Sequence, residues 1–271
     1  MDDLGYIRPD FLKRFCGGGI LRMEIISILF FMNPKVKFKI DPKKDLVTAK
    51  SFINESIFDD GRNLEWVFFK KYPELRGMVK DAKDTDYKFL NRFIAKKYKE
   101  NREVAVNNFK NYEMDWQKIE KKYFVLVGDL FPGVVWPKGK YIAYATIWGM
   151  FPRFLEDKTF QIPIKYRSRR YVSVIIAHEM LHFMFYEHIK RNYPQYKDPE
   201  HSFLVWHISE IFNSLIQDSP TWLKVFKKKT MPYPEHEKVI MALRKQHPDP
   251  AMLKAGDLIQ KITPIAVKLM K

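Results

Sequence analysis

Cysteine is nearly absent from this sequence, because Cys16 is the single one among 271 residues. One cysteine excludes an internal disulfide and fits a reducing compartment. Long hydrophobic runs are missing too, since no stretch reaches the roughly 18 uncharged apolar residues of a membrane span. The closest run, residues 19–32, is interrupted by Arg22 and Glu24 and lacks the cleavage site of a secretory signal. We therefore expect a cytoplasmic protein without a membrane span.

Glycine is also scarce, with 11 in the chain, and Gly17–Gly19 is its one cluster. Met23 follows soon after, and one hypothesis is that Met23 is the true start and that residues 1–22 do not belong to the native protein. The sequence has no internal repeat and no low-complexity tract. Its hydrophobic content of 46% and aromatic content of 15% indicate an ordered globular protein.

Acidic residues are outnumbered, since 48 Lys and Arg against 32 Asp and Glu give a net charge of +16. Such an excess raises the question of a nucleic-acid partner. The basic residues are spread along the chain, and no DNA- or RNA-binding motif accompanies them. Two clusters stand out, Arg167 with Arg169 and Arg170, and Lys227–Lys229. We interpret the charge as a solvated basic surface and do not favour a nucleic-acid partner.

The most informative residues are His178, Glu179 and His182. On a helix, positions i and i+4 share a face, so the two imidazoles can bind one metal ion together. Glu179 points about 100° around the helix from His178, and its long side chain can still reach a water on that metal. A zinc ion lowers the pKa of bound water to roughly 7, and a carboxylate can then take its proton.

The surroundings predict that this helix is buried. Residues 171–176 and 183–186 are apolar on nearly all sides. Polar groups inside such a helix need partners, because burying them unpaired costs several kcal/mol, roughly 2–7. Ser168 is a suitable N-cap, and the helix should stop before Pro194. The alternative to a metal site is a core helix whose histidines hydrogen-bond to backbone carbonyls.

The His-Glu-x-x-His pattern resembles the signature of zincin metallopeptidases, and the resemblance covers roughly residues 140–217. His188 occupies the third-ligand position of the metzincin branch, with Met231 and Pro232 as a candidate Met-turn. That branch needs a glycine where this chain has Phe185, which should continue the helix. His188 would then lie about 15 Å along the axis from His178. We therefore do not favour His188 as a ligand.

Glu210 is a better third ligand. Asp198-Pro199-Glu200 is a good helix start, and Glu210 is a lone acid among apolar residues of the helix that should follow. This resembles the gluzincin arrangement, in which a downstream helix supplies a glutamate as the third ligand. The other candidates for the third ligand are His201, Glu200 and His207.

Further polar residues near Glu210 could assist the site. His207 lies one turn before it and could be a ligand, an oxyanion donor or simply a surface histidine. Asn213 or Ser214 could hydrogen-bond a ligating histidine. The sequence does not show which tyrosine could stabilise an oxyanion, and three candidates remain: Tyr166, Tyr171 and Tyr186.

Two strands are predicted before the histidine helix, at residues 141–148 and 159–164, which are rich in β-branched and aromatic residues. Pro163 lacks an N–H group and therefore favours an edge strand. In zincins an edge strand pairs with the substrate backbone. The resemblance thus implies a substrate-binding strand formed by Thr159, Phe160, Gln161 and Ile162. The alternative is a hairpin that only packs on the helix.

We expect four regions: an N-terminal segment 1–35, a mainly helical region 36–131, a catalytic core 132–220 and C-terminal helices 221–271. A single domain from residue 36 onward is the alternative. Pro264 should kink or end a C-terminal helix. The predicted fold class is α+β, predominantly helical, with a zincin-like core whose small antiparallel or mixed sheet packs on the histidine helix.

The resemblance implies a metallopeptidase that hydrolyses a peptide or protein substrate. One Zn²⁺ per chain would be held by His178, His182 and Glu210, with Glu179 as the general base. One alternative is another zinc amide hydrolase, such as a small-molecule deacylase. A second is a DNA-associated, SprT-like protease, although such proteins usually take a histidine third ligand. The non-enzymatic alternative is a basic nucleic-acid-binding or scaffold protein with a structural metal site. Such a site has no use for Glu179 and needs a fourth protein ligand.

Overall fold

The computed structural model describes residues 33–54, 58, 61, 64–77 and 87–269, so Cys16 and the hypothetical start at Met23 lie outside the described residues. Helices make up 64% of the residues that the structure describes and accompany a small mixed sheet, which confirms the α+β class. Among the helices of the described ranges, none combines the length and hydrophobicity that a membrane span requires.

The sheet has four strands in the order β1-β2-β4-β3. Its strands are β1 (Lys37–Lys39), β2 (Ile142–Thr146), β3 (Arg153–Phe154) and β4 (Thr159–Pro163). The first three in spatial order are parallel, and β3 pairs with β4 in the antiparallel sense. Because β1 precedes the helices of the N-terminal region and yet pairs with β2, that region and the predicted catalytic core share one sheet.

The prediction that β4 is an edge strand is wrong. β3 pairs with it through Phe160 and Thr159, so β3 forms that edge of the sheet. The missing N–H group of Pro163 constrains the pairing of that residue alone, so it does not predict where the whole strand lies in the sheet. Pro163 ends β4, beyond the two-residue β3, so its missing N–H group interrupts no pairing with that strand.

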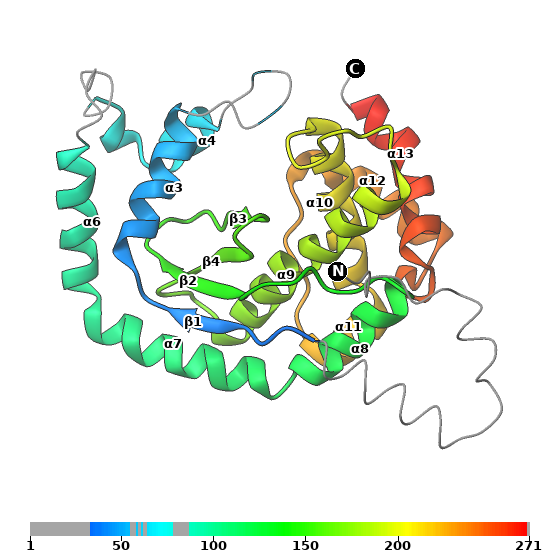
Figure 1. The fold of residues 1–271 in the computed structure, drawn as a ribbon, viewed down its shortest axis with the longest axis horizontal. Coiled ribbons are helices and arrows are strands. Elements are labelled where there is room, and N and C mark those ends of the chain that lie inside the picture. Colours follow the sequence, from blue (N-terminus) through cyan, green and yellow to red (C-terminus); the bar gives the residue numbers. More distant parts are fainter. Residues whose placement is uncertain (1–32, 55–57, 59–60, 62–63, 78–86, 270–271) are drawn as a thin grey trace, which may run out of the picture.

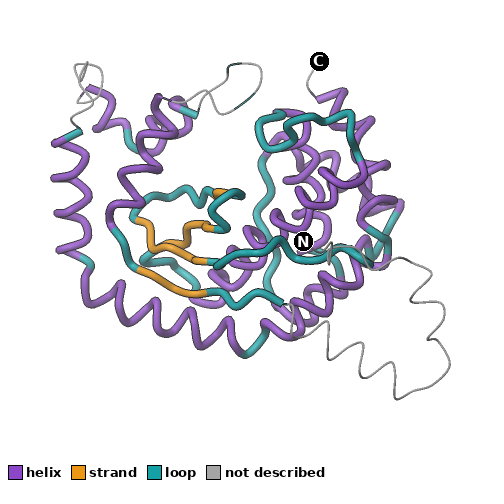
Figure 2. Tube along the Cα trace, viewed as in Figure 1, coloured by secondary structure: helices purple, strands orange, loops and turns teal. Residues whose placement is uncertain are grey.

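Helices follow β1 and surround the sheet, in agreement with the prediction of a mainly helical N-terminal region. Figure 1 shows α3, α6 and α7 around one side of the sheet and α10, α12 and α13 gathered on the other, and Figure 2 shows how small the sheet is beside them. The helical elements before β2 are α3 (Pro42–Asn54), α4 (Glu65–Lys71), η1 (Pro73–Leu75), α6 (Lys88–Glu100), α7 (Arg102–Gln117) and α8 (Glu120–Leu130).

The longest helix in the described ranges, α9 (Arg169–Asn192), is the predicted histidine helix. Ser168 is its N-cap residue with extended backbone, and the helix stops before Pro194 as expected. It packs against β4, α7, α8 and two later helices, which explains why it is apolar on almost all sides. The apolar core around it is continuous from Val36 to Ala266.

The following helix, α10 (Phe203–Gln217), starts later than the expected Asp198-Pro199-Glu200. Those residues form a turn instead, in which the His201 backbone N–H donates to the Asp198 carbonyl at 3.3 Å. Ser202 caps the helix by accepting a hydrogen bond from the Val205 backbone.

The C-terminal region is helical as predicted. α13 continues through Pro264, which therefore does not end it. The remaining elements are α11 (Pro220–Phe226), η2 (Pro234–His236), α12 (Glu237–Gln246), η3 (Pro250–Met252) and α13 (Ala255–Leu269).

Candidate metal centre

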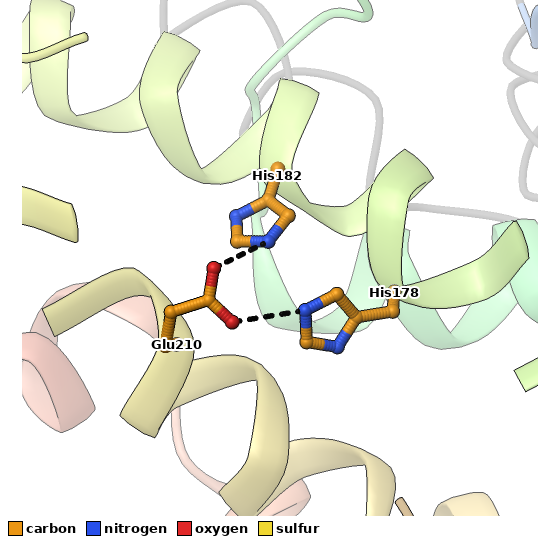
Figure 3. Close-up of side chains that lie close together, drawn as sticks. All are labelled: His178, His182 and Glu210. Atoms are coloured by element: carbon orange, nitrogen blue, oxygen red, sulfur yellow. Dashed lines mark hydrogen bonds and ion pairs between the residues drawn. The ribbon is translucent and has the colours of Figure 1, made fainter. Parts of the chain in front are cut away.

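α9 and α10 bring three ligand-type side chains together (Figure 3). Nε2 of His178 lies 3.1 Å from Oε2 of Glu210, and Nε2 of His182 lies 3.4 Å from Oε1 of the same carboxylate. One ligand atom from each of the three residues lies within 4.8 Å of the others. Among the described residues this is the one cluster of His, Cys, Asp and Glu that could hold a metal ion. The predicted triad is thus assembled.

Two amide side chains on α10 hold the first histidine. Oε1 of Gln217 lies 2.9 Å from Nδ1 of His178, and Nε2 of Gln217 donates to the backbone carbonyl of Val174 at 2.9 Å. Asn213 donates to the backbone carbonyl of His178 at 3.1 Å. In the neutral form of His178, with Gln217 accepting the Nδ1–H proton, the Nε2 lone pair would be free on the side of Glu210, as metal ligation requires.

Gln217 was missed in the sequence analysis although the signal was present. It lies seven residues after Glu210, on the same face of α10 as Glu210 and Asn213, and it is buried at the end of an otherwise apolar helix. A buried amide at that spacing indicates a partner on the facing helix.

The charges of the triad favour a cation between the imidazoles and the carboxylate. Burial opposes protonation of His178, but the hydrogen bond and charge of Glu210, the charge of Glu179 and the hydrogen bond to Gln217 together outweigh burial and raise the pKa to about 9. Burial, reinforced by Arg153, lowers the pKa of His182 to about 3, so this ring is neutral. Burial would raise the pKa of Glu210, but the two imidazoles hold it well below its usual value. A carboxylate facing two ring nitrogens fits a metal ion as well as a proton.

The donor set also leaves polar atoms that a metal site would explain. Both ring nitrogens of His182 are fully buried. Nε2 has only the 3.4 Å contact with Oε1 of Glu210, which a metal ion between them would replace, and Nδ1 has no hydrogen-bond partner within the described residues. Such orphaned atoms are rare in cores. Two imidazoles and one carboxylate are the ligands that zinc takes in hydrolytic sites.

Glu179 lies next to the triad in sequence but does not join it. Its carboxylate is buried, and burial raises its pKa to about 7. Oε2 has no hydrogen-bond partner among the described residues. Glu179 is therefore a buried carboxylate outside the group of three side chains that could hold a metal ion.

Arg153 is the group that the sequence analysis missed altogether. It comes from β3, and its Nη1 lies 3.5 Å from Oε1 of Glu210, while Nη2 donates to the Tyr186 hydroxyl at 3.1 Å. Nothing in the sequence signals this contact, because β3 has only two residues and its position depends on its pairing with β4.

Several other predicted residues lie elsewhere. His207 is buried and its Nδ1 lies 2.7 Å from Nε2 of His236, not in the triad. The other ligand candidates are engaged on the surface, His201 with Asp198 and Glu200 with Lys190. Ser214 is buried, and its backbone carbonyl accepts a hydrogen bond from Arg244.

α9 continues through Phe185 as predicted, so His188 stays outside the triad. Its ring lies against Phe131, with centroids 5.6 Å apart. Of the three tyrosines, Tyr186 is the one at the site, since its ring centroid lies 6.2 Å from that of His182. Tyr171 accepts a hydrogen bond from the Met231 backbone, and Tyr166 stacks on it.

The predicted substrate-binding strand is buried along its whole length in β4, including Phe160 and Ile162. Gln161 hydrogen-bonds Asp45 and Thr48 in the core. With β4 inside the sheet, the strand that borders the site is β3, which carries Arg153.

Comparison of the chain with protein-family models, curated proteins and solved structures gave no match. The candidate metal centre therefore rests on its geometry.

Proposed function

We propose that this protein is a zinc-dependent metallopeptidase. One observation carries the proposal: His178, His182 and Glu210 converge on one point while the adjacent carboxylate of Glu179 stays without a hydrogen bond at Oε2. A structural zinc site uses four protein ligands, whereas a hydrolytic site uses three and leaves a position for water. Three ligands with a spare carboxylate support the hydrolytic alternative.

The roles of the residues follow from their positions. A zinc ion held by the triad would polarise a peptide carbonyl and make water acidic enough to lose a proton near neutral pH. Glu179 would accept that proton and return it to the leaving amine. Gln217 would keep Nδ1 of His178 protonated and so keep Nε2 free for ligation, since the hydrogen bond between these side chains fixes the tautomer.

The experiment that tests the proposal is Glu179→Gln. We expect this variant to keep its zinc, measured by elemental analysis, and to hydrolyse a mixed peptide library roughly 10²- to 10⁴-fold more slowly than the wild type. Glu187→Gln is the matched control, because Glu187 lies on the same helix and pairs with Arg191 instead of the site. The control should retain both zinc and activity.

Three results would contradict the proposal. A fully active Glu179→Gln variant would show that Glu179 is not the general base. A variant that loses its zinc would show that Glu179 is a ligand. A wild-type protein that cleaves N-acylated amines of small molecules but no member of the peptide library would support the deacylase alternative.

A further inference from the structure

The guanidinium of Arg153 lies beside a carboxylate that the metal site needs. Oε1 of Glu210 is 3.5 Å from Nη1 of Arg153 and 3.4 Å from Nε2 of His182, so the cation and the ligating imidazole face the same oxygen. Nε of Arg153 is fully buried and has no hydrogen-bond partner among the described residues. The guanidinium therefore has donors to spare at the site.

Neutralising Glu210 does not account for this arginine in a metal-bound protein. A divalent ion on Glu210 supplies more positive charge than the carboxylate can balance, and it becomes the largest local charge. Even with Glu179 ionised, a guanidinium and a divalent ion exceed two carboxylates in charge. Buried excess charge is costly unless an opposite charge pairs with it. The site therefore favours a ligand that brings its own negative charge.

Arg153 also lies where such a ligand would meet the site. His182 is fully buried and the side chain of Glu210 is 6% exposed, whereas the side chains of His178 and Arg153 are 16% and 15% exposed. His178 and Arg153 are thus the two groups at the site whose side chains are partly exposed. The Tyr186 hydroxyl accepts a hydrogen bond from Nη2 of Arg153, and the centroid of the buried Tyr186 ring lies 5.3 Å from the guanidinium carbon. Both contacts fix the orientation of the guanidinium.

We propose that Arg153 binds a carboxylate of the substrate next to the amide bond that is cleaved, so that the substrates are peptides with a negative charge at that position. The inference rests on the proposed peptidase function, because it specifies the substrate of the same site. Arginine suits this role, since its planar fork matches a carboxylate through two parallel hydrogen bonds. Such a carboxylate is either a free C-terminus or an acidic side chain.

The test is a binding measurement on zinc-loaded Glu179→Gln protein, which separates binding from hydrolysis. Three probes are titrated calorimetrically: N-acetyl-trialanine with a free carboxylate, its carboxamide, and the carboxamide in which glutamate replaces the last alanine. At least one carboxylate probe should bind about 10- to 100-fold more tightly than the neutral amide, as expected for a hydrogen bond to a charged group. Which of the two carboxylate probes binds distinguishes a C-terminus from an acidic side chain.

Adding Arg153→Met to the same background should abolish the preference for a carboxylate. Arg170→Met is the matched control, since Arg170 is exposed on the first turn of α9, and it should keep the preference. Arg153→Lys keeps the charge but loses the fork, so it should retain part of the preference even if the methionine variant folds poorly. Zinc content and melting temperature are measured for each variant.

Equal affinity for acid and amide probes would overturn the inference, and so would a preference that survives in Arg153→Met. The outcome for the proposed function is separate. If the wild type hydrolyses no peptide but Arg153 still selects the carboxylate, the peptidase proposal fails and the carboxylate site stands. If the wild type cleaves acid and amide peptides equally well, the peptidase proposal stands and the role of Arg153 fails.

Discussion

Glu210 faces three groups at once: the ring nitrogens of His178 and His182 and the guanidinium of Arg153. Each oxygen of its carboxylate lies near a different imidazole, so the negative charge is shared between the two rings. Replacing it by a neutral group should weaken metal binding more than it disturbs the shape of the site. A glutamine has the same size, but it loses the charge and replaces one acceptor oxygen by an NH2 group, which cannot ligate a metal ion.

Glu210→Gln should lower the zinc affinity by on the order of 100-fold or more, because replacing even an outer partner of a ligand typically costs 10- to 100-fold. Competition with a chelator of known affinity measures this. Glu200→Gln is the control, since Glu200 was the competing ligand candidate on the same stretch of chain and pairs with Lys190 in the structure. If Glu200→Gln loses zinc and Glu210→Gln keeps it, the assignment of the third ligand is reversed.

The helices of the site could be predicted from the sequence, while the strand beside it could not. The spacing of His178 and His182 and the lone acid Glu210 are local signals, readable because a helix places residues by a fixed rotation. The contribution of Arg153 depends on β3, whose two residues carry no periodic pattern. Pairing between strands distant in sequence is set by the whole core, which is also why β4 was wrongly assigned to an edge.

At the scale of elements, Asp45 connects α3 to the sheet and to α6. Its carboxylate accepts hydrogen bonds from the Tyr98 hydroxyl at 2.9 Å, the Ile147 backbone at 3.0 Å and Gln161 at 3.2 Å. Burial raises the pKa of this fully buried carboxyl to about 6, although the hydrogen bonds oppose the shift. The native state therefore binds a proton more tightly than the unfolded chain, in which the carboxyl has its ordinary pKa of 3.8.

Because the pKa of Asp45 is higher in the native state than in the unfolded chain, the free energy of unfolding decreases as pH rises between about 4 and 6. Across that window the group removes about 3 kcal/mol from the free energy of unfolding, at 1.36 kcal/mol per pKa unit, and the loss persists at higher pH. Asp45→Asn resembles the protonated carboxyl, and Gln161 can turn its amide to donate to Thr48 and accept from the new side chain. The variant should therefore lack the decrease in the free energy of unfolding that ionisation of Asp45 causes.

Urea unfolding at pH 4.5 and pH 7.0 measures the prediction for wild type and Asp45→Asn. On going from pH 4.5 to pH 7.0, the free energy of unfolding should change by about 2 kcal/mol more favourably in the variant than in the wild type, because Asp45 no longer ionises. Other titrating groups contribute to both proteins and cancel. Equal pH dependence in the two proteins would mean that Asp45 is ionised in the native state at pH 4.5.

At the scale of the whole molecule, the net charge of +16 is distributed over several elements. Lys96 on α6, Arg170 on α9 and Lys227–Lys229 after α11 are exposed, and Arg169 is paired with Asp115 at 2.7 Å. Basic side chains spread over separate elements attract polyanions by counterion release without reading any sequence.

Duplex DNA should therefore bind weakly and lose affinity steeply with salt. Fluorescence anisotropy with a labelled duplex, measured at about 50 mM and about 200 mM salt, should show a fall of roughly 10³-fold or more if six or more phosphates are contacted. The same measurement with a scrambled duplex should give the same curve, because phosphate contacts carry no sequence information. Tight binding that survives near 200 mM salt would contradict the interpretation of a solvated surface. The basic charge would then belong to the function, and a protease acting on DNA-bound proteins would become the better proposal for the same metal centre.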